Sequence, residues 1–265
     1  MQLDEFKNWL VIYCDAQNTI HSYFAEMNKY FMSYTEFTQE NINVYLQKLI
    51  ETGKSKSTFN QFLKAVKKYA QFSNITLQLP KLRKTDRRIK PYLSEKIFQD
   101  IFKEIPYITS TFEKWQSILL ILFYCGLRES EIEHLTREDI DFNKLIIHVK
   151  NTKGKVDRDV PITQEIVKFI ERYYFTEQEQ RGAFNTTAGS IQGIIKTIKQ
   201  NMSMKVLYPH LFRDACCRNW LEKGIPIHQV KYLMGHRHIS TTELYCNSSA
   251  LEAEQGFRKY IKTKI

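Results

Sequence analysis

Several features are absent from this chain of 265 residues, and each absence excludes a class of protein. No apolar run approaches the ~20 residues that a helix needs to span a bilayer, so a membrane protein is not expected. The N-terminal stretch Met-Gln-Leu-Asp-Glu-Phe-Lys is charged and amphipathic, unlike a signal peptide. The sequence contains no Gly-x-x-x-x-Gly-Lys-Ser/Thr loop, which would cradle the phosphates of ATP. These absences predict a cytoplasmic protein that needs neither ATP nor a membrane partner.

The cysteines do not have the spacing of a disulfide framework or of a zinc site. Their number is odd, and no two of them form a Cys-x-x-Cys pair. They are interpreted as reduced thiols, which agrees with a cytoplasmic location. The sequence also lacks the carboxylate cluster that a nuclease with two metal ions needs. We therefore expect no metal and no cofactor. The cysteines are Cys14, Cys125, Cys216, Cys217 and Cys246.

Acidic residues are outnumbered, because 39 lysines and arginines stand against 29 aspartates and glutamates, a net charge of +10. Such an excess favours a polyanion partner such as duplex DNA, or an anionic membrane surface; the alternative is that it serves solubility alone. Between Pro80 and Pro91 lie six basic residues and one acid without apolar periodicity. Residues 79–91 are thus predicted to be a basic linker that approaches DNA phosphates, or a solvated linker with no ligand. The candidate DNA-contacting residues are Arg83, Lys84, Arg87 and Arg88.

Residues 1–78 show apolar residues at helical spacing, which predicts a small bundle of four amphipathic helices. Thr38 is the expected N-cap of one helix, and Gly53 is expected to end it. Ser57 and Thr58 are expected to begin the next. The aromatic residues along these helices are predicted to form the core rather than to stack on bases.

Residues 92–265 are predicted to form a second, larger domain, so the whole chain reads as mainly α with a small antiparallel sheet. Phe112–Cys125 is almost entirely apolar and predicts a buried helix, which Gly126 ends. Two strand-like runs flank Lys153 and Gly154, which predicts a hairpin with these residues in its turn. The runs are 145–149 and 156–162, and further helices are expected from Ser94 and at 163–175, 188–201 and 250–263.

The stretch 208–246 gathers the residues with the most chemistry. Pro209 suits the first turn of a helix, which then places His210 and Arg213 on one face. Ser240 followed by Glu243 is a capping-box pattern, so a helix is expected to begin at Ser240. Two short helices would therefore bring cationic groups close to a phenol, that of Tyr245.

In chain order the motifs are Gly-Leu-Arg128, Lys153-Gly, His210-x-x-Arg213, Gly-His236 and Tyr245. This ordered set, across about residues 120–250, resembles the tyrosine recombinases of the integrase family, and the compact length is most like their Xer-type members. The resemblance implies an enzyme that cuts and rejoins duplex DNA at specific sites through a 3′-phosphotyrosyl intermediate. It also implies a helical, DNA-binding N-terminal domain and a mixed α/β catalytic domain.

Cutting a phosphodiester needs a nucleophile, stabilisation of charge at phosphorus and a proton for the leaving oxygen. By resemblance, Tyr245 would be the nucleophile, and Arg128 and Arg213 would clamp the scissile phosphate. Guanidinium forks match phosphate oxygens two at a time, so two arginines can take the place of a metal ion. Lys153 would protonate the leaving 5′ oxygen.

The remaining roles also follow from the resemblance. His210 would be a general acid or base near the tyrosine, and His236 would hydrogen-bond the phosphate. Glu131, at the acidic position after the first arginine, would orient the site without taking part in the chemistry. The sequence departs from the family at Asp214, where many members have a histidine. His236 with His238 is an alternative metal-binding pair, for which no third ligand is evident.

The resemblance further implies that four protomers assemble on two DNA sites, and that the helix at 250–263 docks on a neighbouring protomer or on its own domain. Two other functions remain as alternatives. One is a type IB topoisomerase, which uses the same chemistry to relax supercoils. The other is a non-catalytic DNA-binding protein built on the same scaffold.

Overall fold

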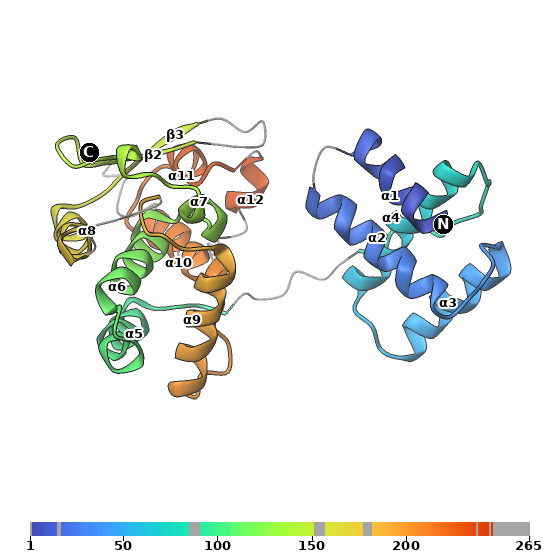
Figure 1. Cartoon of the computed structure of the whole chain (residues 1–265), viewed down its shortest axis with the longest axis horizontal. Helices are drawn as coiled ribbons and strands as arrows, with labels where there is room; N and C mark the ends of the chain where they lie inside the picture. Colours follow the sequence, from blue (N-terminus) through green and yellow to red (C-terminus); the bar gives the residue numbers. More distant parts are fainter. Residues whose placement is uncertain are drawn as a thin grey trace, which may run out of the picture. The chain divides into compact units, whose positions relative to one another are not determined.

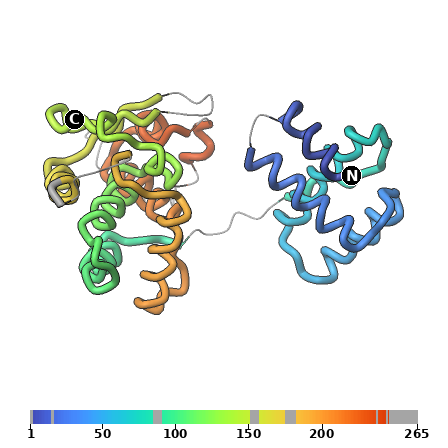
Figure 2. The backbone as a smooth tube through the Cα atoms, viewed as in Figure 1, coloured from blue at the N-terminus to red at the C-terminus, as the bar shows by residue number. Residues whose placement is uncertain are grey.

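The chain divides into two compact units, residues 1–89 and 90–265, each with its own hydrophobic core. Figures 1 and 2 trace the backbone as a cartoon and as a tube. In the part of the chain that the structure describes, no helix is long and apolar enough to cross a membrane. This computed structural model describes residues 2–14, 17–84, 91–150, 157–176, 182–236, 238–243 and 245.

The first unit is a bundle of four helices, as the sequence predicts. Its core is rich in aromatic side chains, and Phe6, Tyr30 and Phe62 are fully buried, so the prediction that these residues form the core is confirmed. Thr38 caps α3, as expected, because its hydroxyl accepts from the Asn41 amide. The helices are α1 (Gln2–Tyr13), α2 (Gln17–Phe31), α3 (Gln39–Glu51) and α4 (Lys56–Ser73).

The predicted start of α4, at Ser57, is wrong by one residue. The helix begins at Lys56, and its N-cap is Ser55, whose hydroxyl accepts from the Thr58 amide at 3.1 Å. Ser57 therefore lies inside the first turn. Ser and Thr are strong N-cap residues, and three of them stand close together in Ser55-Lys-Ser57-Thr58. Sequence pattern alone does not determine which of them caps.

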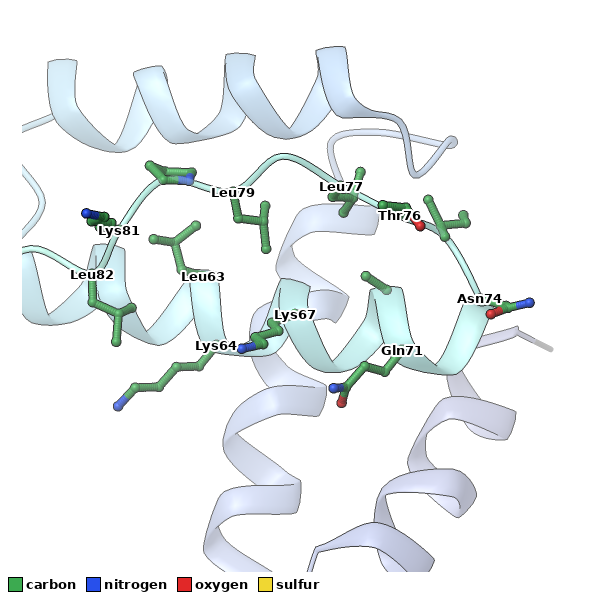
Figure 3. Close-up of a pocket in the computed structure, with 13 residues that line it drawn as sticks. Leu63, Lys64, Lys67, Gln71, Asn74, Thr76, Leu77, Leu79, Lys81 and Leu82 are labelled. Atoms are coloured by element: carbon green, nitrogen blue, oxygen red, sulfur yellow. The ribbon is translucent and has the colours of Figure 1, made fainter.

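The segment after α4 folds back along this helix, and it includes the beginning of the basic stretch. The side-chain amide of Gln39 exchanges hydrogen bonds with the backbone of Gln78, and that of Asn60 does the same with Arg83. A groove separates the segment from α4, with Leu63 and Leu79 facing each other across it (Figure 3). Three lysines also line the groove: Lys64, Lys67 and Lys81.

The second unit contains a three-stranded antiparallel sheet in the order β1-β2-β3. Its strands are β1 (Ile140–Asp141), β2 (Ile146–Val149) and β3 (Arg158–Pro161). The predicted hairpin is confirmed as the β2–β3 pair, with Ile147 opposite Val160. The short edge strand β1 is additional. A mainly helical chain with a small antiparallel sheet is therefore confirmed.

Helices make up the rest of the second unit and position the candidate site. Ser94 caps α5 through a hydrogen bond from the Ile97 amide, as predicted, and residues 117–123 of the apolar run at 112–125 are buried. This run is an α-helix that continues as a π-helix, η1, against which α10 packs (Figure 1). The elements are α5 (Glu95–Ile108), α6 (Phe112–Leu120), η1 (Ile121–Cys125), α7 (Glu129–Glu133), the 3-10 turn η2 (Arg137–Asp139), α8 (Gln164–Thr176), α9 (Ala188–Asn201), α10 (Pro209–Glu222), α11 (Ile227–Met234) and α12 (Ile239–Glu243).

The expected helix start at Ser240 is wrong by one residue, because α12 already begins at Ile239. Tyr245 lies two residues beyond the end of this five-residue helix. The expected helix at 250–263 lies outside the described residues.

Candidate active site

The loop that carries Arg128 depends on a glycine. The π-helix η1 ends at Gly126, whose φ of 64° lies in the left-handed region. A Cβ at this position would lie 2.9 Å from Met234 Cε and 3.1 Å from Cys216 Sγ. Glycine is therefore required for the backbone angle, and an added Cβ would also displace the flexible end of the Met234 side chain. Single π-turns inside helices are frequent at functional sites, and this one directs the chain into Arg128 at the start of α7.

Arg128 is held by a carboxylate one turn further along the chain. Glu131 accepts from the Arg128 guanidinium at 2.6 Å and from the Arg128 backbone amide at 2.8 Å. Arg128 also donates to the Gly235 carbonyl at 3.4 Å, which links α7 to the end of α11. Its side chain keeps 25% of its surface exposed, so a phosphate can reach the guanidinium.

A second arginine, Arg158 on β3, binds the same carboxylate as a fork. Its two terminal nitrogens lie 3.0 and 2.9 Å from the two oxygens of Glu131, and its Nε donates to the Leu233 carbonyl at 2.7 Å. Arg158 is 2% exposed. Burial alone would raise the pKa of Glu131, but hydrogen bonds and positive charge from Arg158 and Arg128 outweigh it and lower the pKa to about 2. Glu131 is therefore ionised and orients both arginines.

Arg213 is as deeply buried as Arg158, with 2% of its surface exposed. Its terminal nitrogens donate to the carbonyls of Gly126 and Met234, at the C-terminal ends of η1 and α11. Such carbonyls lack helical partners and carry partial negative charge, so Arg213 fastens two helix ends together. Burial and the nearby charge of Arg128 lower the pKa of Arg213 to about 10, at which it is still protonated at neutral pH.

His236 follows directly after this junction. Gly235 ends α11 with a φ of 58°, and a Cβ there would lie 3.0 Å from an Arg158 nitrogen. His236 Nδ1 is 2.9 Å from the Thr242 hydroxyl on α12, which fixes the ring. Burial and the charges of Arg213 and Arg128 lower the pKa of His236 to about 4. The ring is therefore neutral at pH 7, and a neutral imidazole has one N–H to donate.

Tyr245 is linked to the other residues of the site by a hydrogen bond to Asp214. The Tyr245 hydroxyl donates a hydrogen bond to Asp214 Oδ1, and His210 Nε2 lies 3.3 Å from the same oxygen. Tyr245 is 7% exposed and packs with Cys217, Val230 and other apolar residues of α10 and α11. Burial, followed by the hydrogen bond to Asp214, raises the pKa of the Tyr245 phenol.

Arg213 Nη1 also lies 3.9 Å from a Glu131 oxygen. Glu131 is therefore surrounded by three arginines, Arg128, Arg158 and Arg213. Their formal charges leave a net +2 beside a neutral histidine, which suits a phosphodiester anion. Within the described parts of the chain, no group of three or more His, Cys, Asp or Glu side chains is arranged to hold a metal ion.

The structure brings Arg128, Arg213 and His236 together around the end of α11, and it joins His210 and Tyr245 through Asp214. Lys153 lies outside the described residues. Its neighbour Lys150, at the end of β2, forms an ion pair with Asp139.

Of the candidate DNA-contacting residues, Arg83 and Lys84 are described, and Arg87 and Arg88 are outside the described residues. The Arg83 guanidinium lies 4.0 Å from the ring centre of Phe59 on α4, as a cation–π contact. Its backbone is held by Asn60. The residue is exposed, so its charge faces solvent from a fixed position on the first unit.

Sequence reasoning missed Arg158 and gave Asp214 no role in the site. The signal for Arg158 was available, because Arg158 and Val160 alternate on the buried face of β3 and the buried Ile162 continues this pattern just beyond the strand. An arginine on such a face needs a partner. For Asp214 the only sequence signal was the departure from the family at this position. Its contact with Tyr245 joins residues 31 positions apart, and no local spacing predicts it.

Comparison with known proteins agrees with this arrangement. The phage integrase family matches residues 91–252. The chain is 27% identical to the tyrosine recombinase XerA of Pyrococcus horikoshii, over 97% of this chain and 92% of that protein. It is 30% identical to the tyrosine recombinase XerC of Chlamydia trachomatis, over 82% of this chain and 75% of that protein.

Among solved structures, the Tn1549 transposon integrase in complex with circular intermediate DNA shares the fold, with a TM-score of 0.77 and 18% identity over 98% of this chain and 99% of that one. The chain therefore belongs to the phage integrase family, that of the tyrosine recombinases. Its activity is site-specific DNA recombination, and the topoisomerase and non-catalytic alternatives are not favoured.

Proposed function

We propose that this chain cuts and rejoins duplex DNA with Tyr245 as the nucleophile and Arg128 and Arg213 as the phosphate clamp. The observation that carries the proposal is the meeting of both arginines and His236 at the end of α11. Arg213 donates to the Met234 carbonyl, Arg128 donates to that of Gly235, and His236 comes next in the chain. A phosphate bound there would meet a net positive charge and a neutral N–H donor, which together stabilise the charge that develops at phosphorus.

The leaving 5′ oxygen needs a proton, and we assign this role to Lys153. Lys150 is a weaker candidate, because it is paired with Asp139. Lys153 and Lys155 both lie in the turn that sequence reasoning places between β2 and β3. The assignment to Lys153 rests on its resemblance to the Lys-Gly pair of the family hairpin.

The wider assembly is also a proposal. The first unit would bind duplex DNA, with Arg83 and Lys84 on phosphates and Arg87 and Arg88 extending the same binding surface. Four protomers would exchange strands on two sites, with the stretch 250–263 docked on a neighbour. Such an enzyme would act in the cytoplasm. The Tn1549 integrase structure, which contains DNA, supports the DNA partner by similarity of fold.

The test begins by finding a site. A library of random duplexes is bound to the protein, and the retained DNA is sequenced. A duplex with the recovered sequence is then nicked close to the cleavage position, so that the short 5′-hydroxyl strand diffuses away and the covalent complex accumulates. Wild-type protein is expected to give a slow band on a denaturing gel, and Tyr245→Phe to bind equally well and give none.

Tyr208, at the N-cap of α10, provides the matched control. Tyr208→Phe removes another phenol hydroxyl from the same unit and should leave the band in place. An equal band from Tyr245→Phe would remove Tyr245 from its role. Relaxation of a supercoiled plasmid that lacks the recovered site would favour the topoisomerase alternative.

A further inference from the structure

The acceptor of the Tyr245 proton is a carboxylate. A phenol has one hydrogen to donate, and that of Tyr245 is directed to Asp214 Oδ1. Both residues are almost completely enclosed, Asp214 with 4% and Tyr245 with 7% of its surface exposed. A general base must lie within hydrogen-bond reach of the proton that it removes, and Asp214 meets this requirement.

The environment of Tyr245 makes such a base necessary. Burial and the negative charge of Asp214 both favour the neutral phenol, so their effect is to raise its pKa above the ordinary value of about 10. At neutral pH a phenolate is therefore not available before the reaction. The proton has to leave while the bond to phosphorus forms.

We propose that Asp214 is the general base of the cleavage step and the general acid of the rejoining step, a role that rests on the function proposed above. In cleavage, a lone pair of Tyr245 Oη forms the bond to phosphorus, the bond between phosphorus and the 5′ oxygen breaks, and the phenol proton passes to Asp214 Oδ1. The 5′ oxygen receives its proton from the lysine of the hairpin turn. Rejoining reverses each transfer, so Asp214 returns its proton to the departing tyrosine.

A carboxylate is a weak base for a free phenol, but the phenol becomes more acidic as its oxygen bonds to phosphorus. Serine/threonine kinases use an aspartate in the same way on substrate hydroxyls, which are less acidic than a phenol. In this chain His210 Nε2 lies 3.3 Å from the same carboxylate oxygen. His210 is thus placed to orient Asp214, whereas Asp214 itself contacts the reacting hydroxyl.

The test uses the nicked duplex and full-length protein in single-turnover cleavage. Asp214→Asn keeps the shape of the side chain and removes its ability to accept a proton as a carboxylate does. We expect cleavage to slow by about 10²–10⁴-fold, the usual range for loss of a general base, with DNA affinity and melting temperature close to wild type. Asp159→Asn is the matched control, since Asp159 also pairs with a histidine, His148 at 2.6 Å, but is exposed on β3. It should cleave at the wild-type rate.

A chemical rescue separates proton transfer from packing. A fluorinated tyrosine at position 245, with a more acidic phenol, should restore the Asp214→Asn rate by about tenfold or more, because an acidic nucleophile depends less on a base. The inference is overturned if Asp214→Asn cleaves as fast as wild type or faster, which would mean that Asp214 only restrains the tyrosine. It is also overturned if the fluorinated residue gives no rescue. If wild-type protein gives no covalent band, that result would instead contradict the proposed function.

Discussion

Replacing Glu131 by glutamine should strongly destabilise the second unit, and the size of the effect follows from the geometry. Arg158 is 2% exposed, and its two terminal nitrogens bind the two Glu131 oxygens. The arginines lower the pKa of Glu131 from 4.5 to about 2, a difference of 2.5, and each pKa unit corresponds to about 1.36 kcal/mol. The folded protein therefore favours the ionised carboxylate by ~3 kcal/mol. Removing one partner of a buried ion pair typically costs about 3–5 kcal/mol.

We therefore expect Glu131→Gln to lower the free energy of unfolding by about 3–5 kcal/mol. For a unit of this size, each kcal/mol corresponds to a shift of about 2–4 °C in melting temperature. Calorimetry, or urea unfolding followed by circular dichroism, measures the change. Because the folded pKa lies below the ordinary value, the stabilising contribution is complete above pH 4.5 and is lost as the pH falls from there towards about 2. Wild type should lose stability more steeply than the variant in that window.

Arg158→Met completes a double-mutant cycle. Each single substitution leaves the other charged side chain buried without its partner. The double variant should therefore lose less stability than the sum of the two single losses. A stability of Glu131→Gln within about 1 kcal/mol of wild type, the range of an exposed pair, would contradict a strong contribution from this buried ion pair. Additive losses in the double variant would contradict the coupling between Glu131 and Arg158.

Three further predictions concern the backbone, the DNA and the leaving group. Gly126→Ala should lower the free energy of unfolding by at least about 1–2 kcal/mol, the cost of a left-handed residue that carries a Cβ, and an unchanged melting temperature would contradict the required glycine. Replacing Arg83 and Lys84 by glutamine should make log K for DNA binding fall less steeply with log salt, by up to ~0.9 for each phosphate that the protein no longer neutralises. This change in slope is expected for any duplex sequence. A slope equal to that of wild type would mean that both side chains face solvent only. Lys153→Ala should slow cleavage by about 10²–10⁴-fold. A DNA substrate with a 5′-bridging sulfur should rescue this variant, because the sulfur leaves without a proton. Rescue of Lys155→Ala alone would move the role to Lys155.

Sequence patterns predicted those features that depend on neighbouring residues. Helical spacing and the cap at Thr38 located the first bundle, and the two β-branched runs located the hairpin of β2 and β3. Where several residues that can cap a helix stand together, as at Ser55 and Ser57, tertiary packing determines which of them lies just outside the helix and acts as the N-cap. The error in the start of α4 is of this kind.

The ordered motifs also determined the family and the candidate site, because each reactive residue type stands in a recognisable local pattern. What only the tertiary structure decided is how these residues contact one another. Arg158 meets Glu131 across 27 positions, and Tyr245 meets Asp214 across 31. Such contacts arise when β3, α7, α10 and α11 pack together, and packing depends on the shape of the whole core rather than on local spacing. The sequence alone thus predicted the candidate catalytic groups, whereas the fold determined that the buried carboxylate of Asp214 accepts the hydrogen bond of Tyr245.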